Sequence, residues 1–124
     1  MSVLSIDDLR EMCDALPYVT SDFPFDADTL VFRLHGKIFA LMSVDPRSTP
    51  PRITLKCEPV LADMLRSTYD AVTPGYHMNK RHWNTVVVDG TIPPPEIEDM
   101  IEHAYQQVFK SLPKSVRESL IRKF

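Results

Sequence analysis

The sequence predicts an α+β fold, an antiparallel β-sheet with helices packed mainly on one face. Three observations indicate this fold. Apolar residues recur at helical spacing near both ends of the chain, β-rich runs lie between those segments, and the loops that join the runs are too short for parallel crossovers. A length of 124 residues suits one hydrophobic core, so we expect a single domain that covers residues 1–124.

The first predicted element is a helix that begins after Ser5 and ends at Pro17. Ser is a good N-cap because its hydroxyl accepts a backbone N–H at the start of a helix, whereas Pro cannot continue one. Acidic residues after the cap suit the positive end of the helix dipole. Apolar residues at spacings of three and four form one buried face: Ile6, Leu9, Met12, Cys13 and Leu16.

A β-hairpin is predicted next. Residues 30–34 and 37–44 are β-rich runs on either side of His35 and Gly36, where Gly can supply the positive φ of a tight turn. The segment 18–29 is rich in Asp, Ser, Thr and Pro, and we expect it to be an extended connection rather than part of the sheet.

A third strand is predicted over residues 52–57, which alternate polar and apolar side chains after a proline-rich loop at 45–51. A second helix should open at Glu58-Pro59, since Pro is tolerated in the first turn. Its buried stripe is expected to comprise Val60, Leu61, Met64 and Leu65.

The last third of the chain predicts one more strand and a long helix. Residues 83–88 form the strand candidate, after an irregular stretch that begins at residue 70. A strongly periodic helix runs from Glu96 to Leu112, and Pro113 stops it. The tail that follows has apolar residues at helical spacing and is expected to form a short terminal helix.

Charge and composition argue against several classes of function. The net charge is −3 and the isoelectric point is about 5.7, whereas a nucleic-acid footprint is normally more basic. Only three glycines are present, too few for a glycine-rich phosphate loop, and no G-x-S-x-G nucleophile motif occurs. We therefore expect no enzymatic activity and no cofactor.

Localisation is predicted from the start of the chain, its apolar runs and its cysteines. No run approaches the roughly 20 apolar residues that cross a bilayer, and the N-terminus lacks the pattern of a signal peptide. Cys13 and Cys57 are expected to be two buried reduced thiols, with a disulfide as the alternative. A cytoplasmic monomer without membrane contact is the prediction.

Metal sites are weakly indicated. His77 and His82 are five residues apart, which is not the i, i+4 spacing of a helical metal pair, and we expect His35 and His103 to be surface residues. The acidic side chains of the first helix could collect hard cations on one face, as carboxylates do. They are Asp7, Asp8, Glu11 and Asp14.

The segment 74–84 has the most unusual composition, because cations, amides and aromatic residues crowd into eleven positions. Such a mixture suits contact with an anion or a nucleic acid. The alternative is structural: Tyr76 and Trp83 anchor the core while Asn79 and Asn84 hydrogen-bond to local backbone.

The run Pro74-Gly75-Tyr76-His77-Met78-Asn79-Lys80-Arg81-His82-Trp83-Asn84-Thr85-Val86 closely resembles the signature of the MmcQ/YjbR family. The hairpin at 28–41 and the strand at 53–57 fit the same pattern, and the resemblance covers roughly residues 5–112. It implies a fold similar to frataxin/CyaY and a DNA-binding role through two hairpin wings. The matched block makes these residues the candidates for any shared site: His77, Asn79, Lys80, Arg81, His82, Trp83 and Asn84.

The leading hypothesis is a non-enzymatic binding module for double-stranded DNA. In it, Arg33 and Lys37 flank one wing, Arg47 and Arg52 lie on another, and Lys80 and Arg81 contact phosphates.

Two alternatives remain. The first is a site for a small ligand or a protein partner, with His77 and His82 as polar determinants and a pocket lined by Tyr76, His82 and Trp83. The second is frataxin-like metal binding on the acidic first helix.

Overall fold

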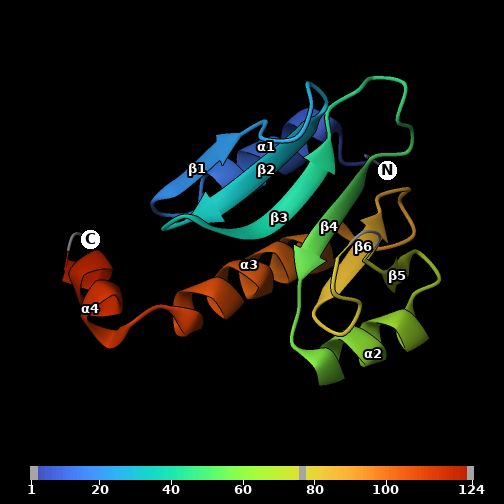
Figure 1. Ribbon diagram of the computed structural model, residues 1–124. Coiled ribbons are helices and arrows are strands. Elements are labelled where there is room, and N and C mark those ends of the chain that lie inside the picture. The colour runs from blue at the N-terminus through green and yellow to red at the C-terminus, as the bar shows by residue number, and fades with distance from the viewer. Residues whose placement is uncertain (1–2, 76–77, 123–124) are drawn as a thin grey trace.

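The computed structural model describes residues 3–75 and 78–122 and confirms the α+β class (Figure 1). The elements in chain order are α1 (Ile6–Asp14), β1 (Val19–Asp22), β2 (Thr29–Leu34), β3 (Lys37–Ser43), β4 (Arg52–Lys56), α2 (Pro59–Thr68), β5 (Val72–Pro74), β6 (Trp83–Val87), α3 (Pro94–Ser111) and α4 (Lys114–Arg122). The strands form one antiparallel sheet in the order β1-β2-β3-β4-β6-β5. No helix in the described part of the chain is long and apolar enough to cross a membrane.

One face of the sheet carries the core. The long helix α3 lies across β2, β3 and β4 and also contacts α1, while α2 lies beside β5 at the other end of the sheet (Figure 1). Side chains of β4 alternate accordingly, because Ile53 and Leu55 are buried whereas Arg52 and Thr54 face the opposite, open side.

The start of α1 has the predicted cap. The Asp8 backbone N–H donates to the Ser5 hydroxyl at 3.1 Å, and the Ser5 N–H donates to the Asp8 carboxylate at 2.8 Å. This reciprocal pair satisfies two backbone donors at the helix start. The hairpin turn is also as predicted, with positive φ at both His35 and Gly36.

Two strands of the sheet are not predicted by the sequence. Residues 18–29 were expected to be only a connection, yet β1 lies within them, and β5 lies in the stretch expected to be irregular. Both are the edges of the sheet. Most of β1 is exposed and β5 has three residues that end in a proline, so neither carries an alternating apolar pattern.

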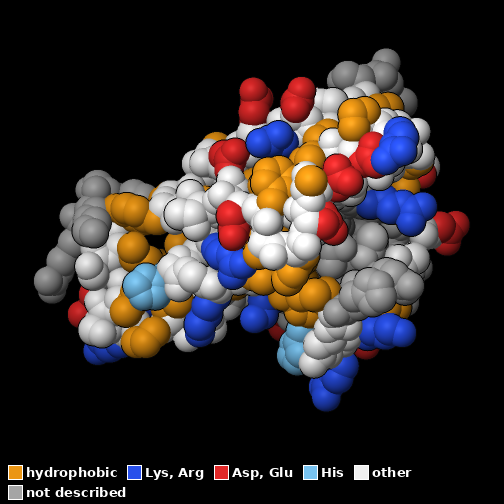
Figure 2. All heavy atoms as spheres, turned by 45° about the horizontal axis from the view of Figure 1, so that its top comes forward, with side chains coloured by type: hydrophobic (Ala, Val, Ile, Leu, Met, Phe, Trp, Pro, Cys, Tyr) orange, Lys and Arg blue, Asp and Glu red, His pale blue; other side chains and the backbone are white. Residues whose placement is uncertain are grey.

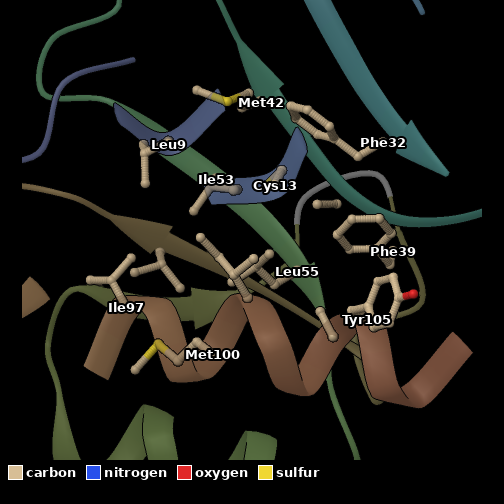
Figure 3. Close-up of a cluster of buried hydrophobic side chains, with 14 of the residues drawn as sticks. Leu9, Cys13, Phe32, Phe39, Met42, Ile53, Leu55, Ile97, Met100 and Tyr105 are labelled. Atoms are coloured by element: carbon tan, nitrogen blue, oxygen red, sulfur yellow. The ribbon is translucent and has the colours of Figure 1, made fainter. Parts of the chain in front are cut away.

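Three aromatic rings of the core pack against one another between the sheet and α3 (Figure 3). The rings of Phe32 and Phe39 are 6.3 Å apart, and Phe39 meets Tyr105 edge-on at 5.7 Å. The register shifts between β2 and β3, because Phe32 pairs with Ala40 whereas Arg33 pairs with Ile38. Phe39 is therefore a bulge residue of β3 that has no partner in the register. The bulge lets Phe39 and Ala40 both be buried.

Both cysteines are buried free thiols, as predicted. Burial raises the pKa of Cys13 to about 12 and that of Cys57 to about 11. A thiol with so high a pKa is almost wholly protonated near neutral pH and is a poor nucleophile.

Candidate functional site

The unusual segment 74–84 forms the loop between β5 and β6 and the first residues of β6. Tyr76 and His77, two of the predicted site residues, lie outside the described residues. Lys80, Arg81 and His82 are exposed, whereas Trp83 and Asn84 are buried.

Arg66 of α2 connects this loop to the rest of the domain. Its Nε donates to Oδ1 of Asn84 at 2.7 Å, and its Nη2 donates to the carbonyl oxygens of Lys80 and, at 3.2 Å, Trp83. Its Nη1 lies 3.5 Å from the exposed carboxylate of Asp63. Asn84 is only 2% exposed, so its amide serves to orient Arg66 rather than to meet a partner in solvent.

Gly75 and Trp83 are in close contact across the β5–β6 pair. The Gly75 N–H donates to the Trp83 carbonyl at 2.8 Å, and a Cβ at position 75 would lie 2.7 Å from the Cβ of Trp83. Asn79 accepts the Arg81 N–H at 3.0 Å through its side-chain oxygen. Trp83 is thus buried and Asn79 bonds to local backbone, as the structural alternative has it, whereas Asn84 bonds to Arg66 and Ala62, which are distant in sequence.

Three of the four cations of the two predicted wings contact other polar groups of the protein. Nε of Arg33 lies 3.1 Å from the Asp22 carboxylate, and Arg47 holds Asp45 with contacts of 2.9 to 3.2 Å. Nζ of Lys37 donates to the Ser111 hydroxyl at 3.4 Å. Among the described residues, Arg52 has no ion pair.

The two wings also lie at opposite ends of the sheet. The turn at 35–36 precedes β3 and the loop at 44–51 follows it, so they are separated by the length of the strand, roughly 20 Å (Figure 1). Figure 2 shows one face of the molecule, on which basic side chains are separated by acidic, apolar and uncharged ones. The structure thus does not bring the predicted wing cations together.

Arg47 and Arg52 do line one common hollow. It lies on the open side of the sheet, has a volume of about 860 Å³, and also includes Met78 from the β5–β6 loop. Its floor carries the hydroxyls of Thr54 and Thr85, which are 3.0 Å apart.

A second cavity of about 330 Å³ lies on the core side, between α2, α3, β4 and β6. This volume is at the lower end of the range of small-molecule sites. Its apolar lining comprises Leu55, Leu61, Leu65, Val86 and Met100. Its polar lining comprises Lys56, Cys57, Asn84, Glu96, Asp99 and His103.

His103 was expected on the surface, and that prediction is wrong. The side chain is half-buried in the cavity wall, and its Nε2 accepts the backbone N–H of Glu58 at 3.2 Å. The neutral ring therefore carries its proton on Nδ1. Burial, together with the charge of Lys110, lowers the pKa of His103, while the charge of Glu58 opposes this shift.

Glu58 and Tyr69 are the residues at the two ends of α2. The Glu58 carboxylate caps α2 by accepting the N–H groups of Val60 and Leu61, each at 3.0 Å. At the other end of α2, the Tyr69 hydroxyl donates to Oε2 of Glu96 on α3. The Tyr69–Glu96 bond joins the C-terminal end of α2 to α3, and the bond from the Glu58 N–H to His103 joins its N-terminal end.

Comparison with known proteins identifies the family. The YjbR family model matches residues 14–107, most of the chain. The uncharacterised protein YjbR of Escherichia coli K12 is 32% identical over 120 residues, which cover 96% of this chain and 99% of that protein. The chain is a member of the YjbR family.

Solved structures carry the same fold as this YjbR domain. The Deinococcus radiodurans protein DR2400, with a DUF419 family-model domain, superposes with a TM-score of 0.88 at 36% identity and covers 95% of this chain and 88% of its own. A Pseudomonas syringae protein gives a TM-score of 0.72 at 28% identity, with coverage of 84% and 98%. The uncharacterised protein YbdF of Escherichia coli O157:H7 is 36% identical over 99 residues, 80% of each chain.

The residues that shape the cavity of the YjbR domain were not among the sequence candidates, Asn84 excepted. Arg66, Tyr69 and Glu96 lie on helical segments where each has an ordinary local explanation as a surface or capping residue. Their partners are 14 to 27 residues away in the chain, so no local pattern pairs them.

The YjbR domain should lose stability in mild acid through His103. The fold keeps this imidazole neutral, whereas the unfolded chain takes up a proton near the ordinary pKa of about 6.5. The neutral imidazole therefore contributes fully to the free energy of unfolding above that pH. This contribution is lost as the pH falls toward the lowered pKa of the folded state. Urea unfolding from about pH 8 to about pH 5 measures the slope.

His103→Gln keeps an acceptor for the Glu58 N–H but does not titrate, so it should flatten the dependence of stability on pH. His35→Gln makes the same substitution at the exposed hairpin turn, away from the contact with Glu58, and is the matched control. An unaltered slope in His103→Gln would contradict this assignment.

Proposed function

We propose that this YjbR domain is a non-enzymatic binding module whose ligand is a small, mostly apolar molecule held in the cavity between α2 and α3. The observation that carries the proposal is the cavity itself. Five apolar side chains line it, and α3 contributes Glu96, Asp99 and His103 to its polar lining. That combination is typical of small-molecule sites, where apolar surface supplies affinity and a few polar groups fix orientation.

The chemistry of the cavity favours binding over catalysis. The pKa of the Cys57 thiol is raised to about 11, chiefly by burial, so it is a poor nucleophile. The imidazole of His103 uses Nε2 to hold the Glu58 backbone and is not paired with a nucleophile. An activated nucleophile and its base are therefore not assembled among these residues.

The proposal predicts that filling the cavity abolishes binding. Leu61 lines the cavity from α2, and Leu61→Phe puts a ring into the space that a ligand needs. We expect affinity for cavity-binding fragments to fall by at least about tenfold, because the ring occupies the volume in which they bind. Fragment screening by NMR on isotope-labelled protein would identify binders through shifts of amides around the cavity.

Val60→Phe is the matched control, since Val60 precedes Leu61 on α2 but is 66% exposed. This variant should bind the same fragments as the wild type. Equal affinity of Leu61→Phe and Val60→Phe, or fragment shifts confined to other surfaces, would reject the cavity as the site.

Double-stranded DNA is the second candidate ligand, and one observation favours it. Lys80 and Arg81 are exposed and form no ion pair within the described residues, so both charges are available to phosphates. Reversing both charges should weaken duplex binding about equally for all sequences and flatten its salt dependence. Fluorescence anisotropy of labelled duplex at low and physiological salt measures this.

Reversal of Lys110 and Lys114, two exposed lysines near the α3–α4 junction, supplies a control with the same change in net charge. If both double variants weaken binding equally, the effect belongs to net charge and not to the β5–β6 loop. Failure of the wild type to bind at low salt would remove DNA as a candidate.

A monomeric state and a cytoplasmic location remain predictions. For the metal alternative, the Asp8 carboxylate is already used in the α1 capping box. Within the described residues, no group of three or more His, Cys, Asp or Glu side chains is placed to hold a metal ion.

A further inference from the structure

We infer that the ligand of the α2–α3 cavity carries a protonated amine, which Asp99 and Glu96 receive; this inference rests on the proposed function. Glu96, Asp99 and His103 are at positions i, i+3 and i+7 of α3 and therefore share one face of the helix. All three line the cavity, and both carboxylates of its lining therefore come from α3.

The α3 side of the cavity has acceptors that no described residue uses. Among the described residues, the Asp99 carboxylate forms no hydrogen bond or ion pair, and Oε1 of Glu96 has no partner, although Oε2 accepts from Tyr69. The helix dipole favours acids anywhere around the first turns of α3, but it does not select the face that they occupy. Glu98, between them in sequence, is exposed and does not line this cavity.

The charge balance of the lining is negative. Glu96 and Asp99 contribute two carboxylates, whereas Lys56 is the one Lys or Arg in the lining, and it forms no ion pair with either acid. His103 stays neutral in the fold because burial lowers its pKa, and the Cys57 thiol is protonated. A cationic head group would therefore be favoured over a neutral one, and an anionic one disfavoured.

The apolar lining defines the rest of the ligand. Leu61 and Leu65 from α2 face Met100 of α3 across the cavity, with Leu55 and Val86 from the sheet. These side chains can cover a short hydrocarbon body but offer it no hydrogen bond. The ligand class is thus a primary amine with an apolar body of a few carbons, compatible with a cavity of about 330 Å³.

Three probes of matched length test the head group: hexylamine, hexanol and hexanoate. Their affinities for the full chain can be measured by NMR titration at one ionic strength. We expect hexylamine to bind about fivefold more tightly than hexanol, as a partly solvated ion pair allows, and hexanoate to bind most weakly. Added salt should reduce the advantage of the amine but not the binding of hexanol.

Two variants assign the preference to the α3 side of the cavity. Asp99→Asn should lower the affinity for hexylamine to nearly that for hexanol, while the affinity for hexanol stays unchanged. Glu98→Gln removes the same charge one residue away, outside the cavity, and should keep the preference of the wild type. Both positions are exposed, so neither change should unfold the domain.

The outcomes separate the two proposals. If hexanol and hexylamine bind equally, and Leu61→Phe abolishes both, the amine inference is overturned while the cavity remains the site. If no probe binds, the proposed function fails, and the inference fails with it. If hexylamine binds but Leu61→Phe and Asp99→Asn leave its affinity unchanged, the amine is attracted elsewhere on the acidic surface and the inference is overturned.

Discussion

Replacing Phe39 with alanine should lower the free energy of unfolding by about 3–5 kcal/mol, the range for removing a large aromatic side chain from a packed core. Phe39 is fully buried, and its ring contacts both Phe32 on β2 and Tyr105 on α3. The loss combines the hydrophobic transfer of the ring with the cavity left between sheet and helix. Urea unfolding, with the midpoint compared at unchanged slope, measures the difference.

Phe25→Ala provides the matched control, because the same side chain is removed from a position that is 65% exposed. We expect its effect to be within about 0.5 kcal/mol of zero, as for most surface substitutions. Comparable losses at Phe25 and Phe39 would contradict the description of the β3 bulge as the means by which Phe39 enters the core.

Replacing Asn84 with alanine should cost about 2–4 kcal/mol, although the residue lies in a block that looks like a binding motif. The change removes the acceptor of the Arg66 Nε–H and leaves a partly buried guanidinium with fewer partners. The same guanidinium holds the Lys80 and Trp83 carbonyls, so the β5–β6 loop should loosen as well. Urea unfolding followed by Trp83 fluorescence reports both effects, since the chain has one tryptophan.

Asn79→Ala makes the same chemical change five residues earlier, where the exposed amide accepts only the Arg81 N–H. A much smaller loss of stability is expected there, because water can satisfy the freed donor. Similar losses at Asn79 and Asn84 would argue against the role given to Arg66.

Much of the fold could be predicted from local sequence. Helix α1 has a good cap and an apolar face, the hairpin has a glycine turn between β-rich runs, and α3 has an unbroken apolar period. Each of these signals lies within a few residues of the structure it specifies. The edge strands β1 and β5 have no such signal. Hydrogen bonds to the neighbouring strand hold them in the sheet, and burial of their own side chains contributes little.

The candidate site was predicted only in part. The 74–84 block includes Asn84, but it suggested solvent contact where the structure has a buried link to α2. Amides, cations and aromatic residues serve equally well for binding and for holding an irregular loop, so composition could not separate these roles. His103 was misassigned because its acceptor role depends on Glu58, 45 residues away.

By itself, the sequence determined the α+β class, most of the elements and, through its signature block, the YjbR family, since periodicity, capping and turn residues act over short distances. Only the tertiary structure decided which polar side chains meet. It set the predicted wing cations at opposite ends of the sheet and brought Glu96, Asp99 and His103 of α3 to a cavity shared with α2. Those outcomes depend on strand order and helix packing, which bring together residues that are distant in sequence.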